Sequence, residues 1–321
     1  MRYFILFMSM VIFSMISCEK EQENVSDSLN WEYGKNEYNL EIDGEVRNFL
    51  IHVPERYSDE EEVALVLMLH GSTGTGTKFY NISRWVEKAD EQGFIAVFPT
   101  ALAYPIIGKN GTSTKWSSDG LDEQVVEGTV IKDDIPFIEE LVKLVKNSFK
   151  INSQRVYISG FSNGGGFVKS EVIPRMSHVF AAASTGGGVG HRQPFTIEGS
   201  YKMPLFNITG TADENLLPLL VNGATALPIQ AKELENQSII WQSIKNSLEG
   251  LCLRDSYEET PDPPIGNTIT FANSEFGDDN ELVLFLVKDM GHNYPNENNN
   301  RHKVVAADVL WTWFNKWELN N

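Results

Sequence analysis

One stretch of eleven residues, 156–166, constrains this chain more than any other, because it joins a strand pattern to a tight turn and a helix pattern. It opens with Val-Tyr-Ile at 156–158, which are β-branched or aromatic residues without charge and are typical of a strand. Gly160, Ser162 and Gly164 then form Gly-x-Ser-x-Gly, and an amphipathic segment follows at 167–173. This context predicts a strand-to-helix turn that presents a serine.

The glycines have a physical reason at these positions. A serine on a sharp strand-to-helix turn has a strained backbone, and neighbouring side chains would collide with it. Gly160 and Gly164 remove those side chains, and the helix start offers free N–H groups to an oxyanion. We therefore predict that Ser162 is a nucleophile; the alternative is a structural turn that happens to contain serine.

The rest of the chain predicts an α/β fold with a mostly parallel sheet and helices on both faces, because short apolar runs alternate with amphipathic segments. An antiparallel hairpin is expected first, over residues 38–54, since Asp43-Gly44 is a strong turn signal. Strands are expected at 63–69, 94–98, 156–158, 179–183, 205–209, 268–271 and 282–287, and helices at 83–92, 130–149, 232–248 and 302–317.

A base and a carboxylate are expected beside the serine, because a protonated hydroxyl is a weak nucleophile. His292 follows the last expected strand, and Asp213 follows an earlier one, so Ser162, Asp213 and His292 occur in the order of an α/β-hydrolase triad. Sites of open α/β sheets lie at these carboxyl ends. His191 stays open as another base, and Glu214 as another carboxylate.

Two backbone donors are expected to form an oxyanion hole. Asn163 follows the nucleophile, and the turn after His70-Gly71 is expected to supply the second N–H from Ser72 or Thr73. A phosphate-binding loop is excluded there, because the stretch lacks the Gly-Lys-Ser/Thr ending.

Composition limits the class of partner. A formal net charge of -18 argues against nucleic acid and anionic membranes. The chain has 321 residues, of which 41% are hydrophobic, so we expect one domain with a large core. The two cysteines, Cys18 and Cys252, offer no zinc-ligand spacing.

The N-terminus reads as an export signal over residues 1–17, with Arg2 before an apolar run. Met-Ile-Ser-Cys at 15–18 resembles the lipobox of bacterial lipoproteins, which implies a lipid on Cys18; an ordinary cleaved signal peptide is the alternative. We expect residues 18–30 to be a flexible tether and 31–321 to be the catalytic domain.

Several motifs together resemble the polyhydroxybutyrate depolymerase and feruloyl or acetylxylan esterase group of α/β-hydrolases. They are the His70-Gly71 turn, the Ser-Asn-Gly-Gly that begins at Ser162, Gly-Thr-Ala-Asp at 210–213 and Gly-His-Asn-Tyr-Pro at 291–295. Asp133-Asp134 before an apolar helix also looks like that group. The resemblance implies the α/β-hydrolase fold and an extracytoplasmic carboxylic ester hydrolase that needs neither cofactor nor metal.

Substrate contacts are expected where the chain departs from that group. The apolar segment around Leu216 and Leu217 is expected to form an acyl wall or a lid, with a buried helix as the alternative. Tyr294 is expected to line the site, and Trp116 to stack on a sugar or an aromatic acyl group unless it anchors its loop.

The function predicted from these features is that of a surface-anchored serine esterase. Its substrate would be a feruloylated or acetylated plant polysaccharide, or a polyester, attacked through an acyl-enzyme. A serine peptidase on the same fold and a non-catalytic surface binding protein are the alternatives.

Overall fold

The computed structural model describes residues 28–198, 202–275 and 280–319. The expected signal segment, the lipidation site Cys18 and most of the expected tether lie outside these residues. Among the described residues, no helix is both long enough and apolar enough to span a bilayer.

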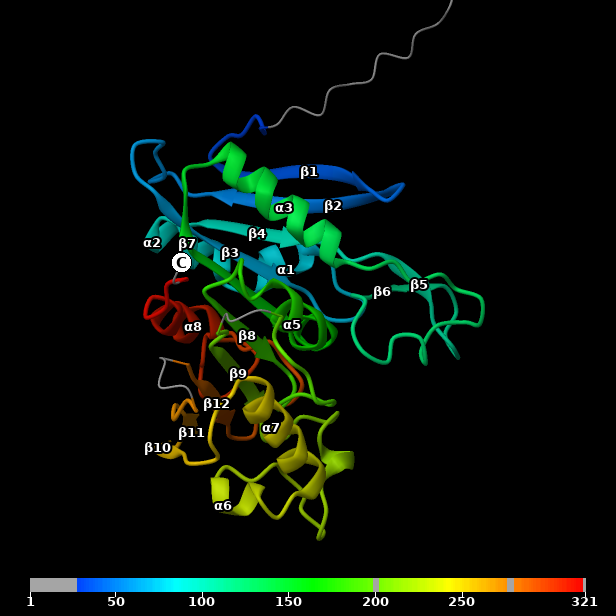
Figure 1. Cartoon of the computed structure of the whole chain (residues 1–321), viewed down its shortest axis with the longest axis vertical. Coiled ribbons are helices and arrows are strands. Elements are labelled where there is room, and N and C mark those ends of the chain that lie inside the picture. Colours follow the sequence, from blue (N-terminus) through cyan, green and yellow to red (C-terminus); the bar gives the residue numbers. More distant parts are fainter. Residues whose placement is uncertain (1–27, 199–201, 276–279, 320–321) are drawn as a thin grey trace, which may run out of the picture.

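A ten-stranded sheet runs through the molecule in the order β1-β2-β4-β3-β7-β8-β9-β12-β11-β10 (Figure 1). The six strands from β4 to β12 in this order are parallel to one another, and the two strands at each end pair antiparallel. The strands of this sheet are β1 (Gly34–Ile42), β2 (Glu45–Val53), β3 (Val63–Leu69), β4 (Ile95–Pro99), β7 (Ile151–Phe161), β8 (Ala182–Gly186), β9 (Leu205–Gly210), β10 (Glu258–Asp262), β11 (Gly266–Phe271) and β12 (Leu282–Val287).

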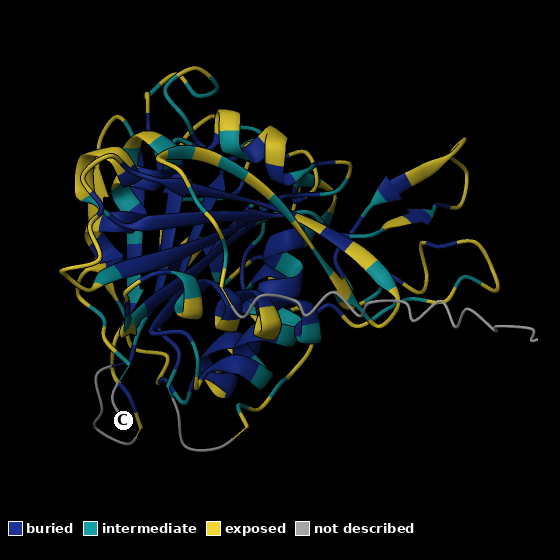
Figure 2. Cartoon of the chain, turned by 90° about the horizontal axis from the view of Figure 1, so that it is seen from above, coloured by how far each residue is buried: buried dark blue, intermediate teal, exposed yellow. Residues whose placement is uncertain are grey.

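The expected N-terminal hairpin is present. β1 and β2 form an antiparallel pair, which begins next to the turn with Ile42 opposite Glu45. The two turn residues, Asp43 and Gly44, have φ of 52° and 79°. Positive φ at both positions is what a two-residue hairpin turn requires, and the Asp-Gly pair tolerates it. A second, small hairpin of β5 (Ala103–Pro105) and β6 (Thr112–Thr114) projects from the body of the molecule (Figures 1 and 2).

Helices cover both faces of the sheet. Because side chains alternate along a strand, Leu65 and Leu67 of β3 join one core cluster, whereas Val66 and Met68 join the other. The first cluster includes residues of α3 and α7, and the second includes residues of α1, α2 and α8. Figure 2 shows the strands buried beneath these layers. The helices are α1 (Gly76–Ile82), α2 (Trp85–Gln92), α3 (Ile135–Ser148), α4 (Asn163–Phe167), the π-helix η1 (Val168–Val172), α5 (Ile173–Met176), the 3₁₀-helix η2 (Leu217–Leu219), α6 (Ala231–Leu234), α7 (Ser238–Gly250) and α8 (Ala306–Phe314).

The predicted fold class is confirmed, and the differences concern boundaries. The helix expected over 130–149 begins only at Ile135, because Pro136 lacks the N–H that an earlier turn would need. The helix expected over 232–248 is divided into α6 and α7. Strand β8 lies three residues later than expected, since Val179 and Phe180 close a turn onto Met176. Helix α1 and strand β10 had no clear sequence signal.

Candidate active site

Ser162 lies on the sharp turn between β7 and α4, with φ of 52° and ψ of -117°. A non-glycine residue at this φ is strained, so the surrounding contacts must hold it. The Ser162 N–H donates to the Gly186 carbonyl at 2.8 Å, and its own carbonyl accepts from the Gly166 N–H at 2.8 Å. The turn is therefore fixed to the end of β8 on one side and to the following helix on the other.

The two glycines that flank the serine allow this turn to pack. A β-carbon on Gly160 would lie 2.5 Å from the Gly164 carbonyl oxygen. One on Gly164 would lie 2.4 Å from the His70 carbonyl oxygen. Both distances are too short for real contacts, so the glycines are needed here for close backbone approach.

The expected partners of the serine meet it in one hydrogen-bonded series. The Ser162 Oγ lies 2.8 Å from His292 Nε2, and His292 Nδ1 lies 2.8 Å from Asp213 Oδ2. The Asp213 side chain is 1% exposed and the His292 side chain 14%. This arrangement fits a neutral imidazole whose Nδ1–H donates to the carboxylate while Nε2 accepts from the hydroxyl.

Neighbouring hydrogen bonds hold Asp213 and His292 in place. Asp213 Oδ1 accepts from the Asn215 N–H at 2.9 Å, which leaves Oδ2 for the imidazole. Glu214 is directed elsewhere: its Oε2 accepts from the His292 backbone N–H at 2.9 Å. Backbone hydrogen bonds, including this one, lower the pKa of Glu214. Glu214 therefore supports the loop that carries His292 and does not replace Asp213.

His191, the other base left open by the sequence, has different partners. Its Nδ1 lies 2.9 Å from Ser247 Oγ and its Nε2 lies 3.1 Å from the Lys169 carbonyl. Burial lowers the pKa of His191 to about 3. Both ring nitrogens of His191 already have partners, so His292 remains the candidate for the base beside Ser162.

The expected oxyanion hole is partly corrected. Asn163 is the first residue of α4, where a backbone N–H has no partner inside the helix. The Thr73 N–H donates to the Thr114 carbonyl at 3.0 Å, so Thr73 is excluded as a donor. Ser72 remains the candidate for the second donor. A β-carbon on Gly71 would lie 3.1 Å from the Ser162 β-carbon, so this turn lies next to Ser162.

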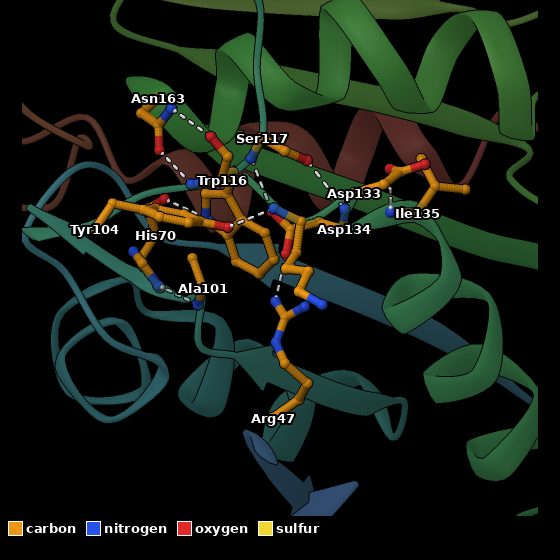
Figure 3. A network of polar contacts seen from close by, with 11 residues as sticks. Arg47, His70, Ala101, Tyr104, Trp116, Ser117, Asp133, Asp134, Ile135 and Asn163 are labelled. Carbon is orange, nitrogen blue, oxygen red and sulfur yellow. Dashed lines mark hydrogen bonds and ion pairs between the residues drawn. The ribbon is translucent and has the colours of Figure 1, made fainter. Parts of the chain in front are cut away.

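The expectation that Trp116 stacks on substrate is wrong, because its side chain is 0% exposed. Its Nε1–H donates to the His70 carbonyl at 2.9 Å, and its backbone N–H donates to Asn163 Oδ1 at 2.7 Å (Figure 3). The Asn163 amide also donates to Ser118 Oγ at 2.8 Å. Trp116 thus anchors its loop and joins the two turns that carry the oxyanion-hole candidates.

His70 fixes the first of these turns. Its Nε2 accepts from the Ala101 N–H at 3.0 Å, and its Nδ1 lies 2.7 Å from the Gly71 carbonyl. Nδ1 must therefore carry the proton. Burial lowers the pKa of His70 to about 4, so the ring is neutral near pH 7.

A buried ion pair continues this network away from the serine. Arg47 of β2 and Asp134 before α3 are 2% and 0% exposed, and Arg47 Nη2 lies 2.5 Å from Asp134 Oδ1 (Figure 3). Asp134 Oδ2 accepts from the Ser117 N–H at 2.8 Å. Burial raises the pKa of Asp134, and Arg47 and Ser117 oppose that shift. Asp133 has another role, since it pairs with Arg175.

Ser162 also lines an open cavity of about 470 Å³. Its lining includes residues of the helix after the serine and the glycine-rich loop after β8. Apolar side chains from later in the chain close it. The lining residues are Ser118, Asp119, Ser162, Gly166, Lys169, Ser170, residues 186–195, Leu216, Leu219, Ile240 and Ser243.

Comparison with known proteins identifies the group to which this site belongs. The phospholipase/carboxylesterase family model matches residues 56–231, which is more than half of the chain. The chain belongs to the phospholipase/carboxylesterase family. The match includes Ser162 and Asp213 but ends before His292.

Curated relatives of this family member carry esterase names. The chain is 26% identical over 185 residues to a bifunctional acetylxylan esterase/xylanase of Neocallimastix patriciarum, a match that covers 56% of this chain and 23% of that protein. It is 26% identical over 140 residues to feruloyl esterase B of Neurospora crassa, which covers 44% and 43%. The chain therefore spans less than half the length of these relatives.

Solved structures agree with the α/β-hydrolase fold. An acetyl xylan esterase from Aspergillus awamori has a TM-score of 0.52 at 14% identity, with 87% of this chain and 99% of that chain covered. An S-formylglutathione hydrolase from Agrobacterium tumefaciens has a TM-score of 0.54 at 15% identity, with 89% and 97% covered. The expected resemblance to esterases of the α/β-hydrolase fold is confirmed.

Of the other residues expected to contact substrate in this phospholipase/carboxylesterase family member, only Leu216 lies on the cavity lining. Leu216 lines the cavity, whereas Leu217 does not. Tyr294 is 3% exposed, and its hydroxyl accepts from Trp85 Nε1 at 2.8 Å and lies 3.2 Å from Ser159 Oγ. The expectation that Tyr294 lines the substrate site is therefore wrong, because it is a core residue behind the His292 loop.

Sequence reasoning missed the polar wall of the cavity. The Gly-Gly-Gly run at 186–188 stands out as a cluster, but nothing in the sequence marks it as a wall. Lys169 lies seven residues after Ser162, so two turns of helix place both on the same side. That spacing was the available signal.

Proposed function

We propose that this chain is a serine esterase that hydrolyses carboxylic esters through an acyl-enzyme. The observation that carries the proposal is the hydrogen-bonded series of Ser162, His292 and Asp213 beside an open cavity. A serine hydroxyl that donates to a neutral imidazole, itself oriented by a buried carboxylate, is the arrangement that nucleophilic acyl transfer requires.

In the proposed reaction, His292 Nε2 takes the Ser162 proton as Oγ attacks the ester carbonyl. The Asn163 and Ser72 N–H groups stabilise the oxyanion, and Asp213 stabilises the imidazolium without taking its proton. The imidazolium then protonates the leaving alcohol, which leaves an acyl group on Ser162. Water activated by His292 releases the acid and restores the serine.

For the substrate, we propose esters attached to plant polysaccharide, acetyl or feruloyl, with polyhydroxyalkanoate-type polyester as the other class. The names of the relatives, acetylxylan esterase and feruloyl esterase, favour the first. Plant polysaccharide lies outside a bacterial cytoplasm, which agrees with the export signal expected at residues 1–17.

The decisive experiment compares the chain with its Ser162→Ala variant on p-nitrophenyl acetate, butyrate and octanoate and on methyl ferulate. Loss of the nucleophile is expected to lower kcat by about 10⁶ if the triad acts as a unit. An equally active Ser162→Ala variant would refute the proposal. Faster cleavage of peptide p-nitroanilides than of esters would replace the esterase with a peptidase.

We also propose a bacterial membrane anchor, a lipid on Cys18, as the only membrane contact. Metabolic labelling with a radioactive fatty acid in a bacterial host is expected to label the chain and not its Cys18→Ser variant. Equal labelling of both, or of neither, would contradict the anchor.

A further inference from the structure

The cavity beside Ser162 contains a cation that the proposed reaction does not use. Lys169 belongs to η1 and lines the cavity that also contains Ser162. Its Nζ donates to the Gly190 carbonyl at 2.7 Å. An ammonium group has three donors, so this contact satisfies only one of them.

The position of Nζ relative to the catalytic base follows from the glycine-rich loop. A β-carbon on Gly188 would lie 3.2 Å from Lys169 Nζ, and one on the preceding residue, Gly187, would lie 2.6 Å from His292 Cε1. The ammonium and the imidazole therefore contact adjacent residues of one loop. A ligand held by Lys169 would lie in the same cavity as Ser162.

Nothing in the described part of the chain neutralises this charge. No carboxylate there forms an ion pair with Lys169. Asp119 lines the same cavity, but the shift in the pKa of Lys169, to about 8, has burial as its cause. The lysine is thus still mainly protonated at pH 7. A partly buried cation without a counter-charge loses some of its solvation, and a bound anion would offset that cost.

The rest of the lining sets the shape of what binds. Leu216, Leu219, Ile240 and Phe195 give the cavity an apolar wall, and its volume of about 470 Å³ suits a small ligand or one unit of a larger one. A ligand that matches these walls has an apolar body and one anionic end.

We infer that the ester substrate carries a carboxylate, and that Lys169 selects it. This inference rests on the proposed esterase function and specifies its substrate class. A half-ester of a dicarboxylic acid would have the carboxylate on its acyl side, and an ester on a uronic acid would have it on the alcohol side. Both have the chemistry that Lys169 recognises, a carboxylate close to the scissile ester.

The kinetic test uses pairs of esters in which an uncharged group takes the place of the carboxylate. For the acyl side, p-nitrophenyl hemiglutarate is compared with p-nitrophenyl pentanoate, and for the alcohol side, 4-acetoxybenzoate is compared with 4-acetoxybenzamide. We expect kcat/KM to favour the carboxylate member of at least one pair. Lys169→Met is expected to reduce that preference by about 10- to 100-fold, the range for a hydrogen bond to a charged group.

The control experiments distinguish an effect of Lys169 on substrate preference from a structural effect on its loop. Lys143→Met removes one positive charge from the exposed surface of α3, and its preference should equal that of the wild type. If Lys169 only supported its loop, Lys169→Met would lower both rates of a pair together. An unchanged preference in Lys169→Met, or no preference in either wild-type pair, overturns the inference.

A binding experiment tests the inference even if the chain hydrolyses none of these esters. Titration calorimetry on the full-length Ser162→Ala variant compares 4-ethylbenzoate with 4-ethylbenzamide. The benzoate is expected to bind at least about tenfold more tightly, and adding Lys169→Met should abolish the difference. Equal affinities refute the carboxylate site, whereas absent hydrolysis with selective binding refutes only the esterase.

Discussion

The two sides of Ser162 are built in opposite ways. On one side, the turn after β3, the loop around Trp116 and the start of α4 form a closed network of hydrogen bonds, which ends in the buried Arg47–Asp134 pair (Figure 3). On the other side, the loop after β8 and η1 leave an open cavity, where the Lys169 ammonium donates to the Gly190 carbonyl.

This difference indicates that the two sides have different tasks. An oxyanion hole is effective when its donors are fixed before the reaction, because no energy is then spent on orienting them. The closed side is suited to that task. A selective pocket instead needs groups that gain a partner only when the substrate binds, since specificity is a difference between affinities. Changes on the closed side should therefore alter stability first, and changes in the cavity should alter substrate preference first.

Arg47→Met tests the closed side most severely. It leaves the Asp134 carboxylate buried without its counter-charge, and breaking a buried pair in this way costs about 3–5 kcal/mol. We expect a loss of this size in the free energy of unfolding, measured by urea denaturation. The Cζ atom of Arg47 also lies 4.1 Å from the centre of the Phe137 ring, and a methionine side chain would keep part of that packing.

The double variant Arg47→Met/Asp134→Leu is the matched control. Removing both charges removes the unpaired carboxylate, so the double variant should be more stable than Arg47→Met alone. If the single variant loses less than about 1 kcal/mol, the pair does not hold the closed side together.

The same contrast explains how much the sequence could predict. Ser162, Asp213 and His292 each follow an apolar strand within a local motif, so their meeting at one sheet edge could be foreseen. The Arg47–Asp134 pair joins residues 87 positions apart, and no local pattern records such a contact. Trp116 is open to two interpretations in the sequence, because composition does not tell a buried tryptophan from one that faces a ligand.

The direction of single side chains limits the prediction in a similar way. Tyr294 comes two residues after the base, which favours a place in the site, but the structure directs it into the core against Trp85. The spacing of Lys169 from Ser162 does not by itself mark a site, because a lysine on a helix is normally a solvated side chain. Such assignments depend on which way a side chain points, and that is decided by tertiary packing.

A pH dependence is expected from His70 on the closed side. In the unfolded chain its pKa is near 6.5, whereas burial lowers it to about 4 in the folded state. The unfolded state therefore binds a proton first as the pH falls. The stability that His70 contributes is complete above about pH 6.5 and is lost as the pH falls toward 4.

Replacing His70 by glutamine should remove this dependence while keeping one donor and one acceptor. Between pH 7 and 4.5, the free energy of unfolding of the wild type should fall by about 2–3 kcal/mol more than that of His70→Gln. Urea denaturation at each pH measures this difference. Parallel curves for His70→Gln would contradict a neutral, buried His70.

The smallest expected effect on stability lies in the cavity, at Leu219. Leu219 is partly exposed and lines the cavity, whereas Leu217, in the same short 3₁₀-helix, does not. Leu219→Ala should change the free energy of unfolding by less than about 1 kcal/mol. Leu219→Ala should nevertheless lower the ratio of kcat/KM for octanoate to kcat/KM for acetate. We expect a decrease of about fourfold for each methylene group of the acyl chain that loses its contact with Leu219, because burying one methylene contributes about 0.8 kcal/mol. Leu217→Ala should leave that ratio unchanged. Equal losses in the two variants would show that the ratio does not depend on contact with the cavity, and would contradict binding of the acyl chain there.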